Sequence, residues 1–180
     1  LANSGPGTLR DAVSANCRHI VFAVGGTITL TSTLLIQRSY LTIDGASAPA
    51  PGITVFSPNI RFSVEPGSSS GPASDIIIHH LRLRGEASGA DDLMELDGSV
   101  RHISRVILDH NTLNSAGDGN FDIYGTVSDV TVSWNLMTDS EQGQHFSLET
   151  PPNRERISFH HNVYARINER QTRMRYDNLQ

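Results

Sequence analysis

Arginine side chains cluster near the C-terminal end of the sequence, and they are the first residues whose type and spacing indicate chemistry. Six of the 14 basic residues lie in this stretch: Arg154, Arg156, Arg166, Arg170, Arg173 and Arg175. The sequence contains no lysine. Because a guanidinium group donates several hydrogen bonds in one plane and suits carboxylate and phosphate partners, this end of the chain is expected to bind an anion.

The chain as a whole is acidic. Its formal net charge is −5 over 180 residues, which argues against a general binder of nucleic acid or other polyanions. No apolar run approaches the roughly 18 residues that a membrane-spanning helix needs, so neither nucleic acid nor a membrane is expected as a partner. The single cysteine, Cys17, excludes an internal disulfide and is expected to be a small buried residue.

The elements that position these side chains are short strands that recur along the chain. Four segments share apolar residues at their first, third and eighth positions, and their starts are between 24 and 30 residues apart. They begin at Ile76, Val106, Val130 and Ile157. A second family of strands lies at residues 93–96, 120–123 and 145–148. Residues 26–30 and 40–45 are interpreted as earlier members of the series.

Alternation of apolar and polar residues marks strands with one buried face. A period of roughly 25 residues with several strands and no helix is too short for a propeller blade and fits a parallel β-helix. The chain is therefore predicted to form one all-β domain over residues 1–180. Asn111, Asn135 and Asn162 follow the same strand in three coils. They predict an asparagine ladder that pairs with turn backbone groups.

The N-terminal end is predicted to be covered by a short capping helix at about residues 8–16. Thr8 is a candidate N-cap, and Asp11 follows three residues later, close to a capping box. A solenoid needs such a lid, because its first coil would otherwise expose apolar core and a strand edge. No comparable cap follows at the other end, so the domain is interpreted as truncated at its C-terminus.

Motifs along nearly the whole chain resemble those of the family 1 pectate lyases. Residues 8–13, 20–28 and 41–53 are similar to the start of these enzymes. Further matches follow in the family's order: residues 106–110 (V-W-I-D-H), 118–123 (D-G-x-x-D), 130–135 (V-T-I-S-x-N), 159–162 (H-H-N) and 169–175 (R-x-P-x-x-R). The resemblance implies a right-handed, single-stranded parallel β-helix that cleaves polygalacturonate by Ca²⁺-dependent β-elimination.

The resemblance assigns the family's calcium-binding carboxylates to Asp92, Asp118 and Asp122. Ca²⁺ takes six to eight oxygen ligands, so water and a substrate carboxylate would have to complete its shell. A single aspartate in a turn more often has a structural role, and it is the presence of three at motif positions that favours a metal site. A further family acid falls on Ala90, for which Asp91 is an imperfect replacement.

The resemblance also assigns roles to three arginines. Arg170 matches the family's catalytic base, and Arg175 matches its second arginine, which together with Arg173 is expected to bind substrate carboxylates. Removal of the C5 proton of galacturonate builds negative charge that a cation and arginines can stabilise. A free guanidinium is normally charged, so a base of this kind requires a tuned environment or alkaline conditions.

Two departures from the family leave other functions open. Residues 138–145 lack the family's substrate-binding lysine, and Gln171 and Thr172 replace its hydrophobic-Pro pair. One alternative is a catalytically inactive β-helix that binds polysaccharide. Another is a polygalacturonase-like hydrolase, which is disfavoured because the chain has no Gly-His-Gly and no lysine. An unsaturated product would distinguish a lyase from both.

The expected partner is an acidic polysaccharide, polygalacturonate or pectin, with Ca²⁺ as cofactor. The protein is expected to be a monomer, and to be secreted because a pectin-degrading enzyme must meet its polymer outside the cell. His160 and His161 are interpreted as strand and turn residues, because neither has a partner at metal-site spacing.

Overall fold

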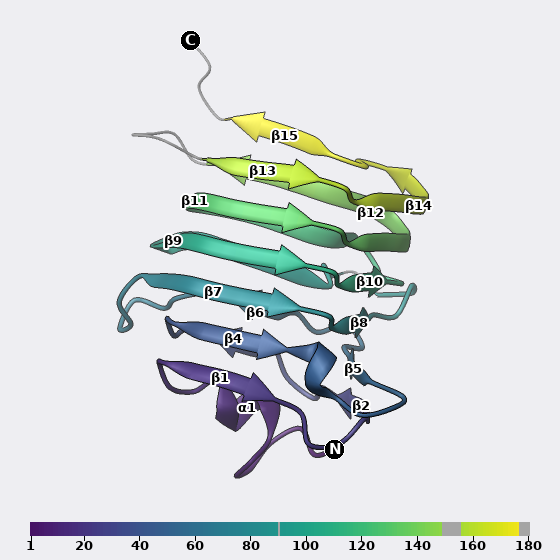
Figure 1. The fold of residues 1–180 in the computed structure, drawn as a ribbon. Helices are drawn as coiled ribbons and strands as arrows, with labels where there is room; N and C mark the ends of the chain where they lie inside the picture. Colours follow the sequence, from purple (N-terminus) through teal and green to yellow (C-terminus); the bar gives the residue numbers. More distant parts are fainter. Residues whose placement is uncertain (90, 149–155, 177–180) are drawn as a thin grey trace.

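Parallel strands make up most of the computed structural model, which describes residues 1–89, 91–148 and 156–176 (Figure 1). The strands stack along one axis, with β1 and β15 at opposite ends of the stack (Figure 1). All recorded pairings between the described strands are parallel. The pairings divide the strands into three columns.

The three columns follow one another along each coil. The first column contains β1 (Arg18–Val21), β4 (Leu41–Asp44), β7 (Ala73–His79), the C-terminal parts of β9 (Met94–Asp109) and β11 (Gly119–Ser133), and β13 (Ile157–His160). The second contains β2 (Gly26–Thr29), β5 (Ile53–Phe56), β8 (Arg82–Arg84), β10 (Thr112–Asn114), the N-terminal part of β12 (Leu136–Leu148), and β14 (Val163–Glu169). The third contains β3 (Leu34–Ile36), β6 (Phe62–Val64), the N-terminal parts of β9 and β11, the C-terminal part of β12, and β15 (Arg173–Tyr176). A short 3-10 helix, η1 (Gly45–Ser47), follows β4.

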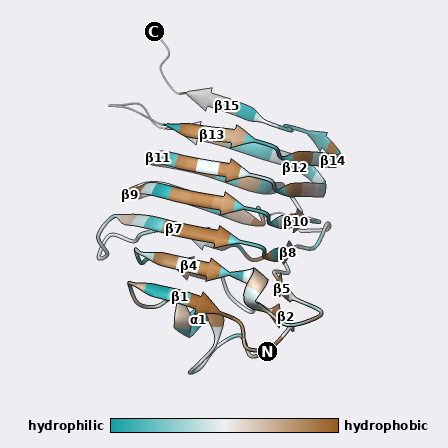
Figure 2. Ribbon diagram, in the orientation of Figure 1, coloured by the Kyte–Doolittle hydropathy of each residue, from teal (hydrophilic) through white to brown (hydrophobic). Residues whose placement is uncertain are grey.

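Strand register in the first column confirms the predicted repeat. The predicted segment starts are paired in successive coils: Ile76, Val106, Val130 and Ile157. Ile76 and Val106 are 0% exposed, whereas the next residues, Ile77 and Ile107, point outward and are 36% and 39% exposed. Figure 2 shows the resulting apolar stretches along β7 and β9 between hydrophilic strand ends. The predicted all-β parallel β-helix is therefore confirmed.

The predicted asparagine ladder is also confirmed. The backbone N–H of Asn111 donates to Oδ1 of Asn135 (2.8 Å), and that of Asn135 donates to Oδ1 of Asn162 (2.9 Å). The side-chain amides of Asn111 and Asn135 donate to the carbonyls of Ile78 (2.9 Å) and Leu108 (3.0 Å). The ladder thereby supplies partners for backbone groups that the turn between the first two columns would otherwise bury unpaired.

The predicted capping helix forms, but it is shorter than residues 8–16. Helix α1 covers Leu9–Ala12. It ends there because other donors take its last carbonyl groups: the hydroxyl of Ser14 and the guanidinium of Arg18 both donate to the carbonyl of Asp11, at 2.6 and 2.7 Å. Within the described ranges, no helix is long and apolar enough to cross a bilayer.

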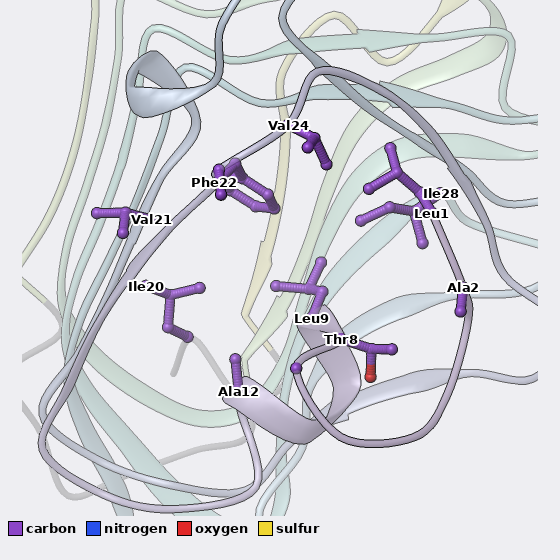
Figure 3. A pocket seen from close by; sticks show the side chains of 12 residues that line it. Leu1, Ala2, Thr8, Leu9, Ala12, Ile20, Val21, Phe22, Val24 and Ile28 are labelled. Carbon is purple, nitrogen blue, oxygen red and sulfur yellow. The ribbon is translucent and has the colours of Figure 1, made fainter.

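Helix α1 covers the first coil of the stack. Its N-cap is Thr8, whose Oγ1 accepts the N–H of Asp11 (3.3 Å). Leu9 turns inward and is 5% exposed. An apolar pocket of about 210 Å³ remains between α1, β1 and the first residues of the chain, with Ile20 and Phe22 in its wall (Figure 3).

The predicted burial of Cys17 is wrong, because this residue is exposed. Cys17 directly precedes β1 and has φ 59°. The residues at the same place before later strands of the first column share this left-handed conformation: Tyr40 (58°), Asp75 (59°), Arg105 (55°) and Asp129 (57°). The turn directs its residue away from the core in each of these coils, so its place in the coil, rather than its residue type, decides the exposure of Cys17.

Candidate functional site

Two of the predicted calcium ligands, Asp92 and Asp122, meet in the third column with a tyrosine hydroxyl between them. The hydroxyl of Tyr124 donates to Oδ2 of Asp122 (2.6 Å) and lies 3.3 Å from Oδ2 of Asp92. Asp122 and Tyr124 share one side of β11, because residues two apart on a strand face the same way. Backbone N–H groups hold the other carboxylate oxygens: Gly119 donates to Asp92 (3.0 Å) and His145 to Asp122 (3.1 Å).

Both carboxyl groups hold a proton more tightly than an exposed aspartate does. Burial raises the pKa of Asp122 to about 7, and the charge of Asp92 adds to this effect. Burial likewise raises the pKa of Asp92 to about 6, with contributions from the charges of Asp118 and Glu95. Burial also raises the pKa of Tyr124, so its hydroxyl remains a donor. A bound cation would favour the ionised form of the pair.

The residues around this pair fit a hard divalent cation. Carboxylate and hydroxyl oxygens surround it, and oxygen is the ligand atom that Ca²⁺ prefers. Gly119 keeps the space between the two carboxylates open, since a Cβ there would lie 2.7 Å from Oδ1 of Asp92 and 2.9 Å from Oδ1 of Asp122. Asp118, the third predicted ligand, directly precedes β11 and is half-buried. Its charge raises the pKa of both other aspartates.

A second acidic group, which sequence reasoning missed, lies beside the first. Glu65, Glu95 and Asp97 each offer a carboxylate oxygen, and these oxygens lie within 4.8 Å of one another. Glu95 is paired in register with Asp122, so the two acidic groups are neighbours. Arg61 already supplies a positive charge here, because its Nη1 lies 3.0 Å from Oε2 of Glu95. The Asp92–Asp122 pair, whose printed partners are backbone and hydroxyl donors and a histidine, therefore has more to gain from a cation.

Strand β15 brings Arg173 and Arg175 into the same column. Arg173 is paired in register with His145, which is itself paired with Asp122. Arg175 is paired with Ser147. Neighbouring strands lie about 4.8 Å apart, so the backbones of Arg173 and Asp122 are roughly 10 Å apart along the axis. The backbone therefore places both predicted substrate-binding arginines in the column that contains Asp122.

Arg170, the predicted base, lies in the turn between β14 and β15 and has φ 55°. Its Nη1 donates to Oε1 of Gln142, and its carbonyl accepts the N–H of Gln144 (2.7 Å). Gln142 in turn donates its own N–H to the carbonyl of Asp118 (3.0 Å). Arg170 thus belongs to the column of turns that contains Asp118, two coils further along. Among the described atoms, its Nε is buried and lacks a hydrogen-bond partner.

The places where the sequence departs from the family lie around this site. Ala90 is outside the described residues. Asp91, its nearest replacement, is 44% exposed, and its Oδ1 lies 3.7 Å from Nε of Arg61. The segment without lysine belongs to β12, where Gln142 contacts Arg170. Glutamine at this point orients the predicted base but adds no positive charge.

Sequence reasoning also missed Tyr124 and His145. Tyr124 was within reach, since strand alternation puts it on the same side of β11 as Asp122. His145 was not, because its position depends on the register between coils of unequal length. That register pairs it with Asp122, and its Nδ1 lies 3.8 Å from Oδ2 of the aspartate.

Comparison with known proteins adds relatives to this geometry. No family model matches the chain. A "Probable pectate lyase C" of Aspergillus fumigatus is 38% identical to it over 140 residues, which are 76% of this chain and 30% of that protein. A "Pectate trisaccharide-lyase" of Bacillus licheniformis is 30% identical over 112 residues, which are 58% of this chain and 32% of that protein. The chain thus spans about a third of these curated relatives.

A solved structure supports the fold independently. The crystal structure of Jun a 1, the major allergen from cedar pollen, aligns with 97% of this chain and 56% of its own at a TM-score of 0.59. The two sequences are 19% identical. At this identity the likeness concerns the fold alone.

Proposed function

Because the chain is a homologue of the pectate lyases, as its motifs indicated, we propose that it belongs to an enzyme that cleaves polygalacturonate by β-elimination with the help of Ca²⁺. The observation that carries the proposal is the buried Asp92–Asp122 pair, bridged by Tyr124 in the column that also contains Arg173. A site for a cation beside arginines suits a polymer that carries one carboxylate per sugar.

Asp92, Asp118 and Asp122 are the proposed calcium ligands. Tyr124 and the backbone N–H groups of Gly119 and His145 hold the first and last of these carboxylates in place. When bound, Ca²⁺ supplies positive charge next to the uronate carboxylate and so favours loss of the neighbouring C5 proton.

Arg170 is the proposed base. A neutral guanidine would take the C5 proton, the electron pair of that C–H bond would form a double bond between C4 and C5, and the C4–O4 bond would break. The departing oxygen then takes a proton from water. Gln142 orients the guanidine through Nη1, and the buried, unpartnered Nε leaves a hydrogen-bond donor free for the substrate. Because a guanidinium is normally charged, we expect activity to increase toward alkaline pH.

Arg173 and Arg175 are the proposed partners of the substrate carboxylates. Their shared strand follows Arg170 by a few residues, so the base and these arginines are positioned by one turn. A planar guanidinium can pair with a carboxylate through two hydrogen bonds. Since pectin is found outside cells, we expect a secreted, monomeric protein.

The test is the ultraviolet absorbance of unsaturated product from polygalacturonate, measured with Ca²⁺ and with a chelator. We expect activity that requires Ca²⁺ and falls by at least about 100-fold in Arg170→Ala, as for loss of a general base. Arg166→Ala is the matched control, because Arg166 lies on β14 but pairs with Asp139.

Two further variants locate the cation. Asp122→Asn should abolish the calcium requirement together with activity, whereas Asp97→Asn, in the second acidic group, should retain both. New reducing ends without a double bond would indicate a hydrolase instead. Binding of the polymer without any cleavage would indicate a polysaccharide-binding protein.

A further inference from the structure

Histidines gather on the outer side of the first column, away from the acidic pair in the third. Six of the eight histidines of the chain lie there: His19, His79, His80, His110, His160 and His161. Two aspartates are aligned with them, since His79 is paired in register with Asp44 on one side and Asp109 on the other. The function proposed above uses none of these side chains.

Four aromatic rings at the ends of these strands form a stack along the axis. Ring centroids are 5.0 Å apart between His80 and His110, 5.8 Å between His110 and Trp134, and 4.2 Å between Trp134 and His161. Adjacent planes are within 14° of parallel. Because the rings cover one another's faces, their edges point to solvent, and the edge of an imidazole carries its nitrogen atoms.

Two pairs of potential metal ligands lie on adjacent coils within this row. Nδ1 of His79 and Nδ1 of His80 are 2.9 Å apart. Oδ2 of Asp109 and Nδ1 of His110 are 2.5 Å apart. Nitrogen ligands at right angles on a metal with bonds of about 2.0–2.1 Å lie about 2.9 Å from each other. The first pair therefore already has the spacing of two ligands on one ion.

We propose that His79, His80, Asp109 and His110 form a binding site for a first-row transition-metal cation such as Zn²⁺. Two or three imidazoles with one carboxylate are a common ligand set for this ion. The side chains of His79 and His110 are 23% and 48% exposed, so they are free to rotate and draw the two pairs onto one ion.

Ser133 supplies the outer support that such a site needs. Its hydroxyl donates to Oδ1 of Asp109 (2.5 Å), which orients the carboxylate and directs Oδ2 toward His110. Metal-binding carboxylates are usually held in this way by a second hydrogen bond.

The ligand chemistry separates this site from the proposed calcium site. Imidazole nitrogen suits Zn²⁺, Ni²⁺ and Cu²⁺, whereas Ca²⁺ takes oxygen ligands. The two sites also lie in different strand columns. Saturating Ca²⁺ should therefore leave Zn²⁺ binding unchanged, and the failure of one proposal would leave the other standing.

The chain contains its own control. Nδ1 of His160 and Nδ1 of His161 are also 2.9 Å apart. The preceding coil, however, offers them Ser133 and Trp134 in place of Asp109 and His110. With only two good ligands, this second pair should bind Zn²⁺ much more weakly.

The experiment is calorimetric titration of the protein, prepared without a histidine tag, with Zn²⁺ in the presence of excess Ca²⁺. We expect one Zn²⁺ per chain and an affinity that falls by at least about tenfold in His79→Gln and in His110→Gln. The double variant His160→Gln/His161→Gln should keep the original affinity. Circular dichroism of each variant checks that the fold is retained.

X-ray absorption at the zinc edge provides a second measurement that does not depend on substitution. We expect a spectrum with at least two imidazole ligands in the unmodified protein. The proposal is overturned if Zn²⁺ does not bind, if binding is unchanged in both single variants, if it is lost in the control double variant, or if the spectrum shows oxygen ligands alone.

Discussion

Asp92 and Asp122 differ from the exposed acids of the chain in what controls their ionisation. Asp75 pairs with Arg105, and a hydrogen bond from that arginine lowers its pKa to about 2. Asp122 is instead 2% exposed, and burial raises its pKa to about 7. A buried carboxyl pair of this kind costs free energy to ionise unless a positive charge enters. At the scale of residues, therefore, cation binding and proton release are coupled.

Calcium affinity should increase with pH. The pKa of Asp92 is about 6 and that of Asp122 about 7, both above the value of an unperturbed aspartate, so protons compete with the cation below these values. We expect the Kd for Ca²⁺, measured by calorimetry, to fall by at least about tenfold between about pH 5 and about pH 8. Asp97→Asn should keep this dependence. An affinity independent of pH would contradict the assignment of the ligands.

Tyr124→Phe should weaken calcium binding while leaving the fold intact. The lost hydroxyl donates to Asp122 and lies beside Asp92, so both carboxylates would lose their orientation. Loss of a group that orients metal ligands costs about 10–100-fold in affinity. Tyr164→Phe is the matched control, because that hydroxyl donates to Gln144 instead (2.5 Å). Equal effects of the two variants in a calcium titration would show that Tyr124 has no specific role.

At the scale of elements, the asparagine ladder holds the turns between the first and second columns. Asn135 is 2% exposed and accepts the backbone N–H of Asn111, while its amide donates to the carbonyl of Leu108. A side chain in this position connects two coils through hydrogen bonds that water cannot replace. The stacking of strands alone would leave these backbone groups buried without partners.

Asn135→Ala should destabilise the protein strongly. The substitution leaves a buried N–H and a buried carbonyl unpaired, at about 1–3 kcal/mol each, so the free energy of unfolding should fall by about 2–5 kcal/mol. Denaturant unfolding measures this change. Asn168→Ala removes an exposed amide that donates to Glu141 and should change the free energy by less than about 0.5 kcal/mol. A loss for Asn135 as small as this would mean that water replaces the ladder.

At the scale of the whole molecule, each coil contacts its neighbours along one axis (Figure 1). Stability in such a stack is close to a sum of coil terms and terms between neighbours. The lid made by α1 therefore protects the first coils directly and the later coils only through them. Leu9 and Val13, at 5% and 2% exposed, are the residues through which this lid meets the core.

Leu9→Ala should loosen the N-terminal coils selectively. Truncating a buried leucine costs about 2–5 kcal/mol, and in a linear stack this cost acts first on the neighbouring coil. Hydrogen exchange followed by mass spectrometry should show faster exchange in β1 and β4, with a much smaller change in β11. Val163→Ala, at a 56% exposed position on β14, is the control. Uniformly faster exchange would show that the stack unfolds as one unit.

The sequence by itself determined the repeat, the parallel β-helix and the asparagine ladder, because alternation within a strand and equivalent positions between coils can be read from spacing. It also indicated the aspartates, through family motifs. Only the tertiary structure decided that Tyr124 joins Asp92 to Asp122, that His145 is paired with Asp122, and that Arg18 ends the capping helix early. These outcomes depend on register between coils of unequal length and on contacts between residues distant in sequence, which spacing alone does not determine.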